Sequence, residues 1–195
     1  RKDSVVEFIS YINRNKISFS SVIKPSIFET NSFLIDNKDT TLIEYSAFFG
    51  SIQILRYLFM NNVELTPSLW LYSIHSKNAE LIHLLESNQI KPPKLVNKNI
   101  SREEIRNSYL SCLIESIKCH HNDIAEYIEN NLIYKQEMKS TRKKEEIIYN
   151  ILKYHNYSYF KTDDIIDQGF FYLCFYGYNK LVDLFMKKEE KSIKE

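Results

Sequence analysis

The sequence predicts an all-α fold in which helix–turn–helix repeats stack into a solenoid. The 195 residues include only three glycines and four prolines. These shares are far below the usual values of about 7% and 5%, and they are too low for a β fold that is rich in tight turns. In addition, a pattern of two apolar residues, one polar residue and two apolar residues recurs along the chain, as is typical of amphipathic helices.

The pattern occurs four times behind a common turn position. Its copies are ILRYL at 54–58, LIHLL at 81–85, IAEYI at 124–128 and LVDLF at 181–185. Because any amphipathic helix can show such a pattern, the preceding residues decide whether it is a repeat. In each copy an apolar segment precedes it at the same offset, and the turn position between them holds Gly50, Lys77, His120 or Gly177. Glycine favours the left-handed cap that ends a helix, so each copy predicts two helices joined by a tight turn.

One column of the second helix is expected to lie in the core. It holds Leu58, Leu85, Ile128 and Phe185. Large apolar side chains on the inner side of a stacked helix are buried by its neighbours, so all four are predicted to be inaccessible to water.

A single repeat domain is predicted over residues 1–195. It comprises an N-terminal half-repeat at 1–38, repeats at 39–65, 66–91, 108–131 and 166–187, and insertions at 92–107 and 132–165. The half-repeat shows the same apolar pattern in VVEFI, Val5 to Ile9, which places Arg1 in the turn position. Two interpretations stay open for it, a capping unit, since terminal repeats are atypical, or the beginning of a fragment of a longer protein.

Further helices are predicted outside the four repeats. Ser101 and Glu104 form a capping box, which favours an unusually long first helix over 102–119. Apolar spacing predicts an extra helix over 145–154, and Pro25 is expected to begin a short bridging helix over 25–34.

The stretch TLIEYSAFFGSIQILRYLFMNNVEL, residues 41–65, resembles the ankyrin repeat. Thr41, Ala47, Gly50 and the ILRYL helix match the repeat's pattern, whereas Leu42 and Glu44 stand where that pattern has Pro and His. The resemblance is strongest over 39–90 and returns at 108–131 and 166–187. In these segments the chain is similar to the divergent ankyrin proteins expanded in some parasitic protists. It implies a stacked helical solenoid that binds proteins, with no catalytic residues.

The resemblance also implies a binding surface, because the two columns before the turn position line the concave groove of such a stack. The candidate partner-binding residues in these columns are Phe48, Phe49, His75, Phe175 and Tyr176. Exposed aromatic side chains are typical anchors of protein interfaces. The alternative is that the first helices pack against the insertions, at 92–101 or 145–154, and bury these rings.

No catalytic, metal or cofactor site is predicted. His120, His121 and Asp123 lie beside Cys119, but adjacent residues on a helix point about 100° apart and do not converge on one ion. The three cysteines have no C-x-x-C spacing, so they are expected to be reduced and to fill small spaces in the core. The sequence also lacks the motifs of hydrolases and nucleotide-binding enzymes.

Charge and hydropathy narrow the partners to proteins. The net charge of +1 gives no field that attracts nucleic acid, and the basic run 142–144 is followed at once by two glutamates. No apolar run reaches the roughly 20 residues that span a membrane, and the charged start is unlike a signal peptide, so a cytoplasmic chain is expected.

The predicted function is a non-catalytic protein–protein interaction scaffold, acting as a monomer or as part of a longer chain. The alternative is a structural spacer that contacts only adjacent repeats of a longer protein, and an enzyme site grafted on the scaffold is a third reading.

Overall fold

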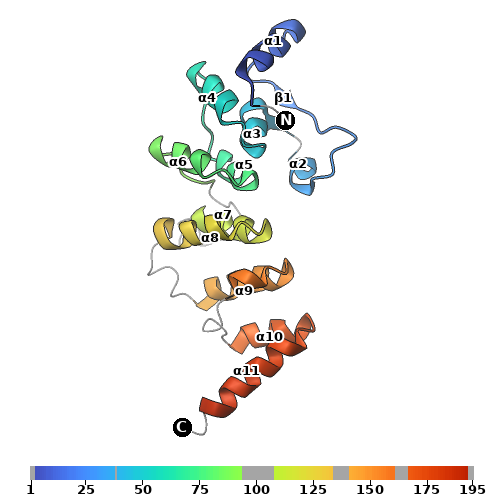
Figure 1. Ribbon diagram of the computed structural model, residues 1–195, viewed down its shortest axis with the longest axis vertical. Coiled ribbons are helices and arrows are strands. Elements are labelled where there is room, and N and C mark those ends of the chain that lie inside the picture. The colour runs from blue at the N-terminus through green and yellow to red at the C-terminus, as the bar shows by residue number, and fades with distance from the viewer. Residues whose placement is uncertain (1–2, 38, 94–107, 134–140, 161–166, 193–195) are drawn as a thin grey trace. The chain divides into compact units, whose positions relative to one another are not determined.

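The computed structural model describes residues 3–37, 39–93, 108–133, 141–160 and 167–192, and these are mostly helical (Figure 1). The prediction of an all-α chain is therefore confirmed. Among the described residues the only strands are two pairs of residues. The chain divides into two compact units, residues 1–108 and 109–195.

The first unit contains six helices and one small antiparallel ladder among its described residues. The elements are α1 (Val5–Asn15), β1 (Val22–Ile23), α2 (Ser32–Asp36), β2 (Thr40–Thr41), α3 (Leu42–Phe48), α4 (Ile52–Met60), α5 (Leu69–Ser76) and α6 (Ala79–Ser87). In the ladder, Val22 lies opposite Thr41 and Ile23 opposite Thr40. Each repeat predicted for this unit therefore contains two helices, α3 with α4 and α5 with α6.

The second unit also contains the predicted helix pairs. Its elements are α7 (Ser108–Lys118), α8 (Asn122–Tyr127) with a π-helical end (Ile128–Leu132), α9 (Thr141–Lys153), a 3₁₀ turn (Tyr157–Tyr159), α10 (Asp167–Phe175) and α11 (Asn179–Ser192). The pairs α7 with α8 and α10 with α11 correspond to the predicted repeats at 108–131 and 166–187. Residues 102–107 of the predicted long helix lie outside the described residues.

The predicted turn position is confirmed in all four repeats. Gly50, Lys77, His120 and Gly177 have φ of +67°, +54°, +58° and +72°. In three of them the next residue donates its backbone N–H to a carbonyl five residues earlier, as in Ser51 to Ser46 at 2.9 Å. This bond pattern, made also by His121 and Tyr178, is that of a helix end closed by a left-handed residue.

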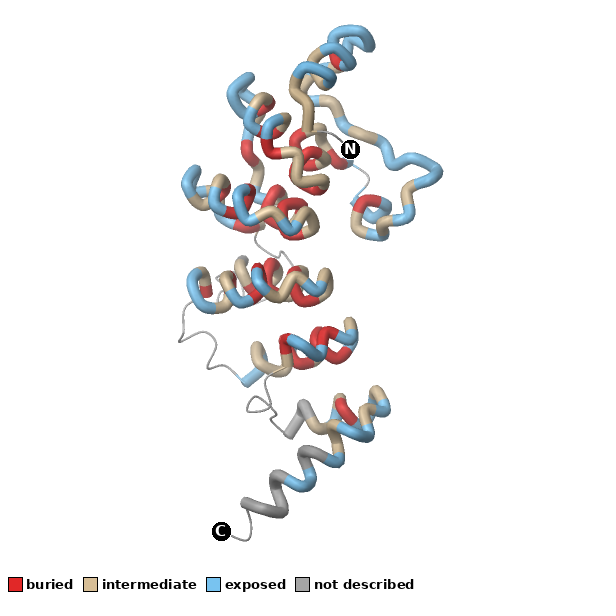
Figure 2. Tube along the Cα trace, viewed as in Figure 1, coloured by how far each residue is buried: buried red, intermediate tan, exposed pale blue. Residues whose placement is uncertain are grey.

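The predicted core column is buried wherever its side chains are described. Leu58, Leu85 and Ile128 are at most 1% exposed, and the side chain of Phe185 lies outside the described part. In the first unit the buried residues gather on α3 to α6 (Figure 2). The register read from the apolar pattern is therefore right for these helices.

Hydrogen bonds join the two helix pairs of the first unit, α3 with α4 and α5 with α6. The buried carboxylate of Glu44 accepts from the backbone N–H and hydroxyl of Thr41, both at 2.8 Å, and from the hydroxyl of Ser68 at the start of the next helix pair. The Asn78 side-chain amide of the second repeat donates to the Gly50 carbonyl of the first at 3.4 Å. Glu44 thus caps α3 with Thr41 and links it to the repeat that follows.

Two local predictions in the half-repeat are wrong. The bridging helix begins at Ser32 instead of Pro25, because the Asn31 side chain caps it by accepting from the N–H of Phe33 at 3.0 Å. In α1 the buried core residue is Ile12. Its carbonyl accepts a hydrogen bond from the N–H of Ile17, just as the Leu58 carbonyl accepts one from the N–H of Val63, so Ile12 is the residue that corresponds to Leu58. The VVEFI pattern therefore aligns three residues away from its true register.

The insertion at 132–165 contains the predicted extra helix, which extends over Thr141–Lys153 as α9. It ends as the first helices of the repeats do, because His155 has a φ of +58° and Asn156 donates its N–H to the Ile151 carbonyl. The Asn156 side chain also donates to the Ile117 carbonyl at 2.8 Å, as Asn78 does to Gly50. Thus α9 has the turn and the contacts of a fifth first helix.

Candidate partner-binding surfaces

The structure buries the first candidate residue, Phe48. Its side chain is 9% exposed, and its ring lies 6.0 Å from Phe33, 5.0 Å from His75 and 4.9 Å from Phe49. Phe49 and His75 are half-buried. Binding at an open groove requires an exposed ring, so the expectation that Phe48 lines such a groove is wrong.

The residue that covers this part of the first helices is Phe33 of α2. Its ring centre lies 4.2 Å from that of His75 and 4.9 Å from that of Tyr72, which is itself buried. The alternative reading, burial of the rings, therefore holds for Phe48, and among the described residues the covering element is α2. Residues 94–101 of the first insertion lie outside the described part of the chain. Sequence reasoning missed Phe33, although a capping Asn31 directly before an apolar pair was a usable signal.

In the second unit the candidate Phe175 is exposed. Its side chain is 70% exposed at the end of α10, whereas that of Tyr176 is half-buried. The two rings meet edge to face with centres 5.2 Å apart. The structure thus places the two candidates of the last helix pair in contact, with the Phe175 ring exposed and the Tyr176 ring half-buried.

A further exposed ring, Phe171, extends this surface, and we call Phe171 and Phe175 the α10 ridge. Phe171 is 62% exposed and lies one helical turn before Phe175, with the rings nearly parallel at 6.1 Å. Sequence reasoning missed Phe171 because only the two columns before the turn position were compared. The i, i+4 spacing of two phenylalanines was a signal that could have revealed it.

Packing beneath the ridge holds α10 in place. On its inner side Leu173 is buried in a cluster with Ile148 and Leu152 of α9. Tyr172 and Tyr176 pack against that cluster, and the Tyr149 ring of α9 lies 5.3 Å from Tyr172. Because the inner residues of α10 are fixed in this way, its two outer rings are displayed on a supported helix.

A positive charge lies beside two other tyrosine rings of the second unit. The ammonium of Lys153 is 5.5 Å from the centre of the Tyr149 ring and 5.3 Å from that of Tyr154. These two tyrosines, Tyr154 foremost, raise the pKa of Lys153, so the side chain is charged at neutral pH. Lys153 is exposed, whereas the two tyrosine rings beside it are half-buried.

The cysteines divide into one core residue and two others. Cys112 is buried, as predicted, and burial raises the pKa of its thiol. Burial, with the Glu115 carboxylate next, raises the pKa of the half-buried Cys119 to about 12. Cys174 is exposed, so its prediction as a core residue is wrong, because it lies on the outer side of α10. Neither Cys112 nor Cys119 forms the thiolate that nucleophilic chemistry needs at neutral pH.

The histidines next to Cys119 are explained by the turn that follows α7. His120 adopts the left-handed conformation of the turn position, and its Nε2 lies 2.9 Å from the Tyr154 carbonyl oxygen. Asp123 is exposed in the first turn of α8, where a negative charge suits the helix dipole.

Comparison with family models, with curated proteins and with solved structures found no significant match to this chain. Within the described parts of the chain, no helix combines the length and the apolar character that crossing a membrane requires.

Proposed function

We propose that the chain is a cytoplasmic protein-interaction module built from divergent ankyrin-like repeats, and that it acts without catalysis. The single observation that carries this proposal is the α10 ridge. Large aromatic rings at 62% and 70% exposure are uncommon on a surface that contacts only water, and such rings commonly anchor protein partners.

The repeat architecture supports the proposal. Left-handed turns recur at the four predicted positions, and Glu44 and Asn78 join one helix pair to the next by hydrogen bonds. Stacked helix pairs of this kind present extended surfaces built from successive first helices. In the last pair that surface is aromatic and uncovered among the described residues, whereas in the first pair α2 covers it.

The test is capture of partners with a variant that lacks the ridge. The double variant Phe171→Ser and Phe175→Ser is compared with the unchanged chain by quantitative mass spectrometry of proteins retained from an extract of the native cell. Both rings are exposed, so folding should be nearly unaffected, within about 0.5 kcal/mol for each change. Retention of a specific partner should fall at least about tenfold, because each anchor contributes roughly 2 kcal/mol.

Met186→Ser is the matched control, because Met186 is an exposed apolar residue of the same unit that lies on α11, outside the ridge. The control should retain the partner at the level of the unchanged chain. Equal retention by the ridge variant, with an unchanged circular dichroism spectrum, would show that the ridge is not the binding surface.

A further inference from the structure

The loop between β1 and α2 carries the two most exposed large apolar side chains among the described residues. Ile27 is 92% exposed and Phe28 is 84% exposed. The backbone around them projects from the first unit and is exposed from Lys24 to Phe28 (Figure 2). Neighbouring apolar side chains with this exposure are typical of a contact surface.

Local hydrogen bonds hold the loop in one conformation. The Ser26 carbonyl accepts from the N–H of Glu29 at 2.9 Å, and its hydroxyl oxygen accepts from the N–H of Phe28 at 3.2 Å. One carboxylate oxygen of Glu29 then accepts from the N–H groups of Thr30 and Asn31, at 3.1 and 3.0 Å. A loop fixed in this way loses little conformational entropy when it binds.

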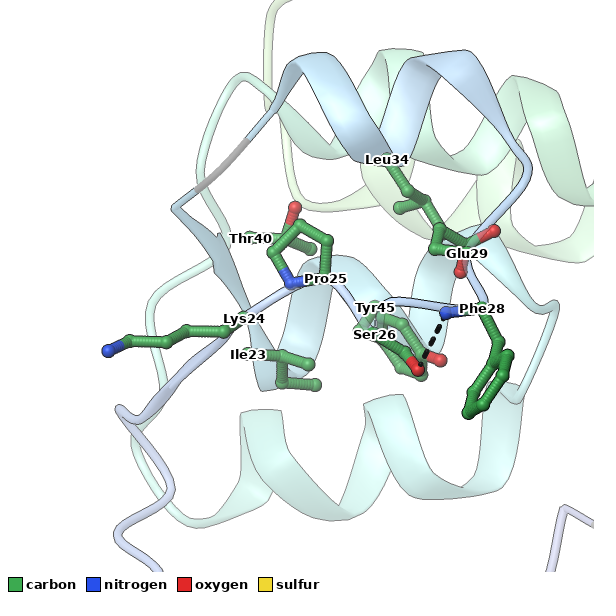
Figure 3. Close-up of a pocket in the computed structure, with 9 residues that line it drawn as sticks. All are labelled: Ile23, Lys24, Pro25, Ser26, Phe28, Glu29, Leu34, Thr40 and Tyr45. Atoms are coloured by element: carbon green, nitrogen blue, oxygen red, sulfur yellow. Dashed lines mark hydrogen bonds between the residues drawn. The ribbon is translucent and has the colours of Figure 1, made fainter.

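The same loop forms the wall of a cavity of about 250 Å³ (Figure 3). Its apolar lining comes from Ile23, Pro25, Phe28 and Leu34, and Tyr45 of α3 lines its floor. Sites for whole small molecules are usually about 300 to 1,000 Å³, so this hollow is better matched to one inserted side chain. A protruding apolar pair and a hollow of side-chain size therefore share one surface.

Charges of opposite sign lie at the two ends of the cavity. The Lys24 side chain extends from one end, and Glu29 lies beside Phe28 at the other (Figure 3). When two copies of such a surface meet about a two-fold axis that is perpendicular to the line joining the two ends, each end of one copy faces the opposite end of the other. Lys24 of each copy is then placed against Glu29 of the second copy.

We propose that this surface, made of Ile23 to Glu29 with Leu34 and Tyr45, pairs with the same surface of a second copy of the chain. The apolar tip of each loop enters the hollow of the other, and two Lys24–Glu29 pairs flank the contact. The partner is a second copy because protrusion, hollow and both charges are self-complementary. The surface has far fewer residues than the roughly 20 to 30 on each side of a standard interface, so the dimer is transient and concentration-dependent.

The first test measures the mass of the full chain by sedimentation equilibrium from about 1 μM to about 1 mM, the range in which small interfaces dissociate. A monomer–dimer equilibrium is expected. Phe28→Ser should raise the dissociation constant at least about tenfold, as loss of a central aromatic anchor does. Val6→Ser, which removes a 79% exposed apolar side chain from α1, should leave the constant unchanged.

The second test exchanges the charges. Lys24→Glu and Glu29→Lys should each weaken the homodimer, because like charges then face each other across the axis. Glu29→Lys also removes the acceptor of the Thr30 and Asn31 N–H groups, so Glu29→Gln, which keeps an acceptor oxygen without the charge, is its control and should weaken the dimer less. An equimolar mixture of the two variants should recover dimer, since both flanking contacts of the mixed pair are again between opposite charges.

Recovery of this kind arises only from an arrangement in which position 24 faces position 29. The proposal is overturned by an unchanged chain that stays monomeric throughout the range. It is also overturned by a Phe28→Ser variant that dimerises like its parent, or by no recovery from two variants whose circular dichroism matches the parent. A failed ridge variant has no bearing on this result, because the ridge lies in the other unit.

Discussion

One residue in each repeat sets the direction change between its two helices, and its backbone conformation explains the pattern seen in the sequence. Gly50 and Gly177 adopt positive φ without a side chain, whereas Lys77 and His120 adopt it despite a penalty of about 1 to 2 kcal/mol. The turn forms even where its residue disfavours positive φ, which indicates that the packing of the two helices fixes its conformation. For this reason the turn position could be found from the flanking apolar residues but not from glycine alone.

Replacing Gly177 should measure this backbone penalty directly. A Cβ built at Gly177 meets no atom within 4 Å, so Gly177→Ala adds strain without a collision. We expect the free energy of unfolding, measured with urea, to fall by about 1 kcal/mol. Lys180→Ala, an exposed position three residues on in α11, is the control and should change it by less than about 0.5 kcal/mol. An unchanged free energy of unfolding for Gly177→Ala would mean that a side chain adds no strain at this turn.

The helices that follow from periodicity were predicted well, and those that depend on distant contacts were not. Apolar spacing placed α3 to α6, α9 and α10 because each buries one face and so repeats its apolar residues every three to four positions. The five-residue helix α2 is too short to show a period. Its position is decided by Phe33, which packs on residues about 15 and 40 positions further along the chain, and by its cap.

The same reasoning separates the predictable from the unpredictable part of the candidate surface. The column alignment identified Phe48 and Phe175 as equivalent residues, and both end a first helix as expected. Their exposure differs, 9% against 70%, because α2 lies over the first and no described element lies over the second. Exposure depends on which element folds back onto the helix, and nothing in the local sequence of either helix records that.

A test of α2 as a cover compares two of its own residues. Phe33→Ala removes the ring that packs on Phe48, Tyr72 and His75, and should lower the free energy of unfolding by about 2 kcal/mol or more. Ile35→Ala removes a side chain of the same helix that is 42% exposed, and should have a much smaller effect. If the two variants lost the same free energy of unfolding in urea denaturation, the Phe33 ring would stabilise the unit no more than an exposed side chain does, and α2 would not act as a cover over α3 and α5.

At the scale of the whole molecule, residues 1–195 form two units that each bury their own apolar residues. The first surrounds Leu55, Leu58 and Leu85, and the second surrounds Ile148, Leu152 and Leu173. The sequence led to one repeat domain over all 195 residues, since the repeats look alike throughout. Composition and periodicity report the helix pairs, but they do not show how contacts divide between neighbouring pairs.

This division predicts that damage to one core stays mainly within its unit. Leu85→Ala removes a side chain that is 1% exposed and should lower stability by about 2 to 5 kcal/mol, because it leaves a cavity between α5 and α6 and the rest of their unit. In a stack of repeats such a loss affects chiefly the neighbouring helix pairs, so hydrogen exchange followed by mass spectrometry should show faster exchange over α3 to α6 and little change over α9 and α10. Leu152→Ala, fully buried in the other unit, is the reciprocal variant and should accelerate exchange over α9 and α10 first. If either substitution accelerated exchange equally in both units, the two would unfold as one cooperative body, and the separation into units would have no energetic counterpart.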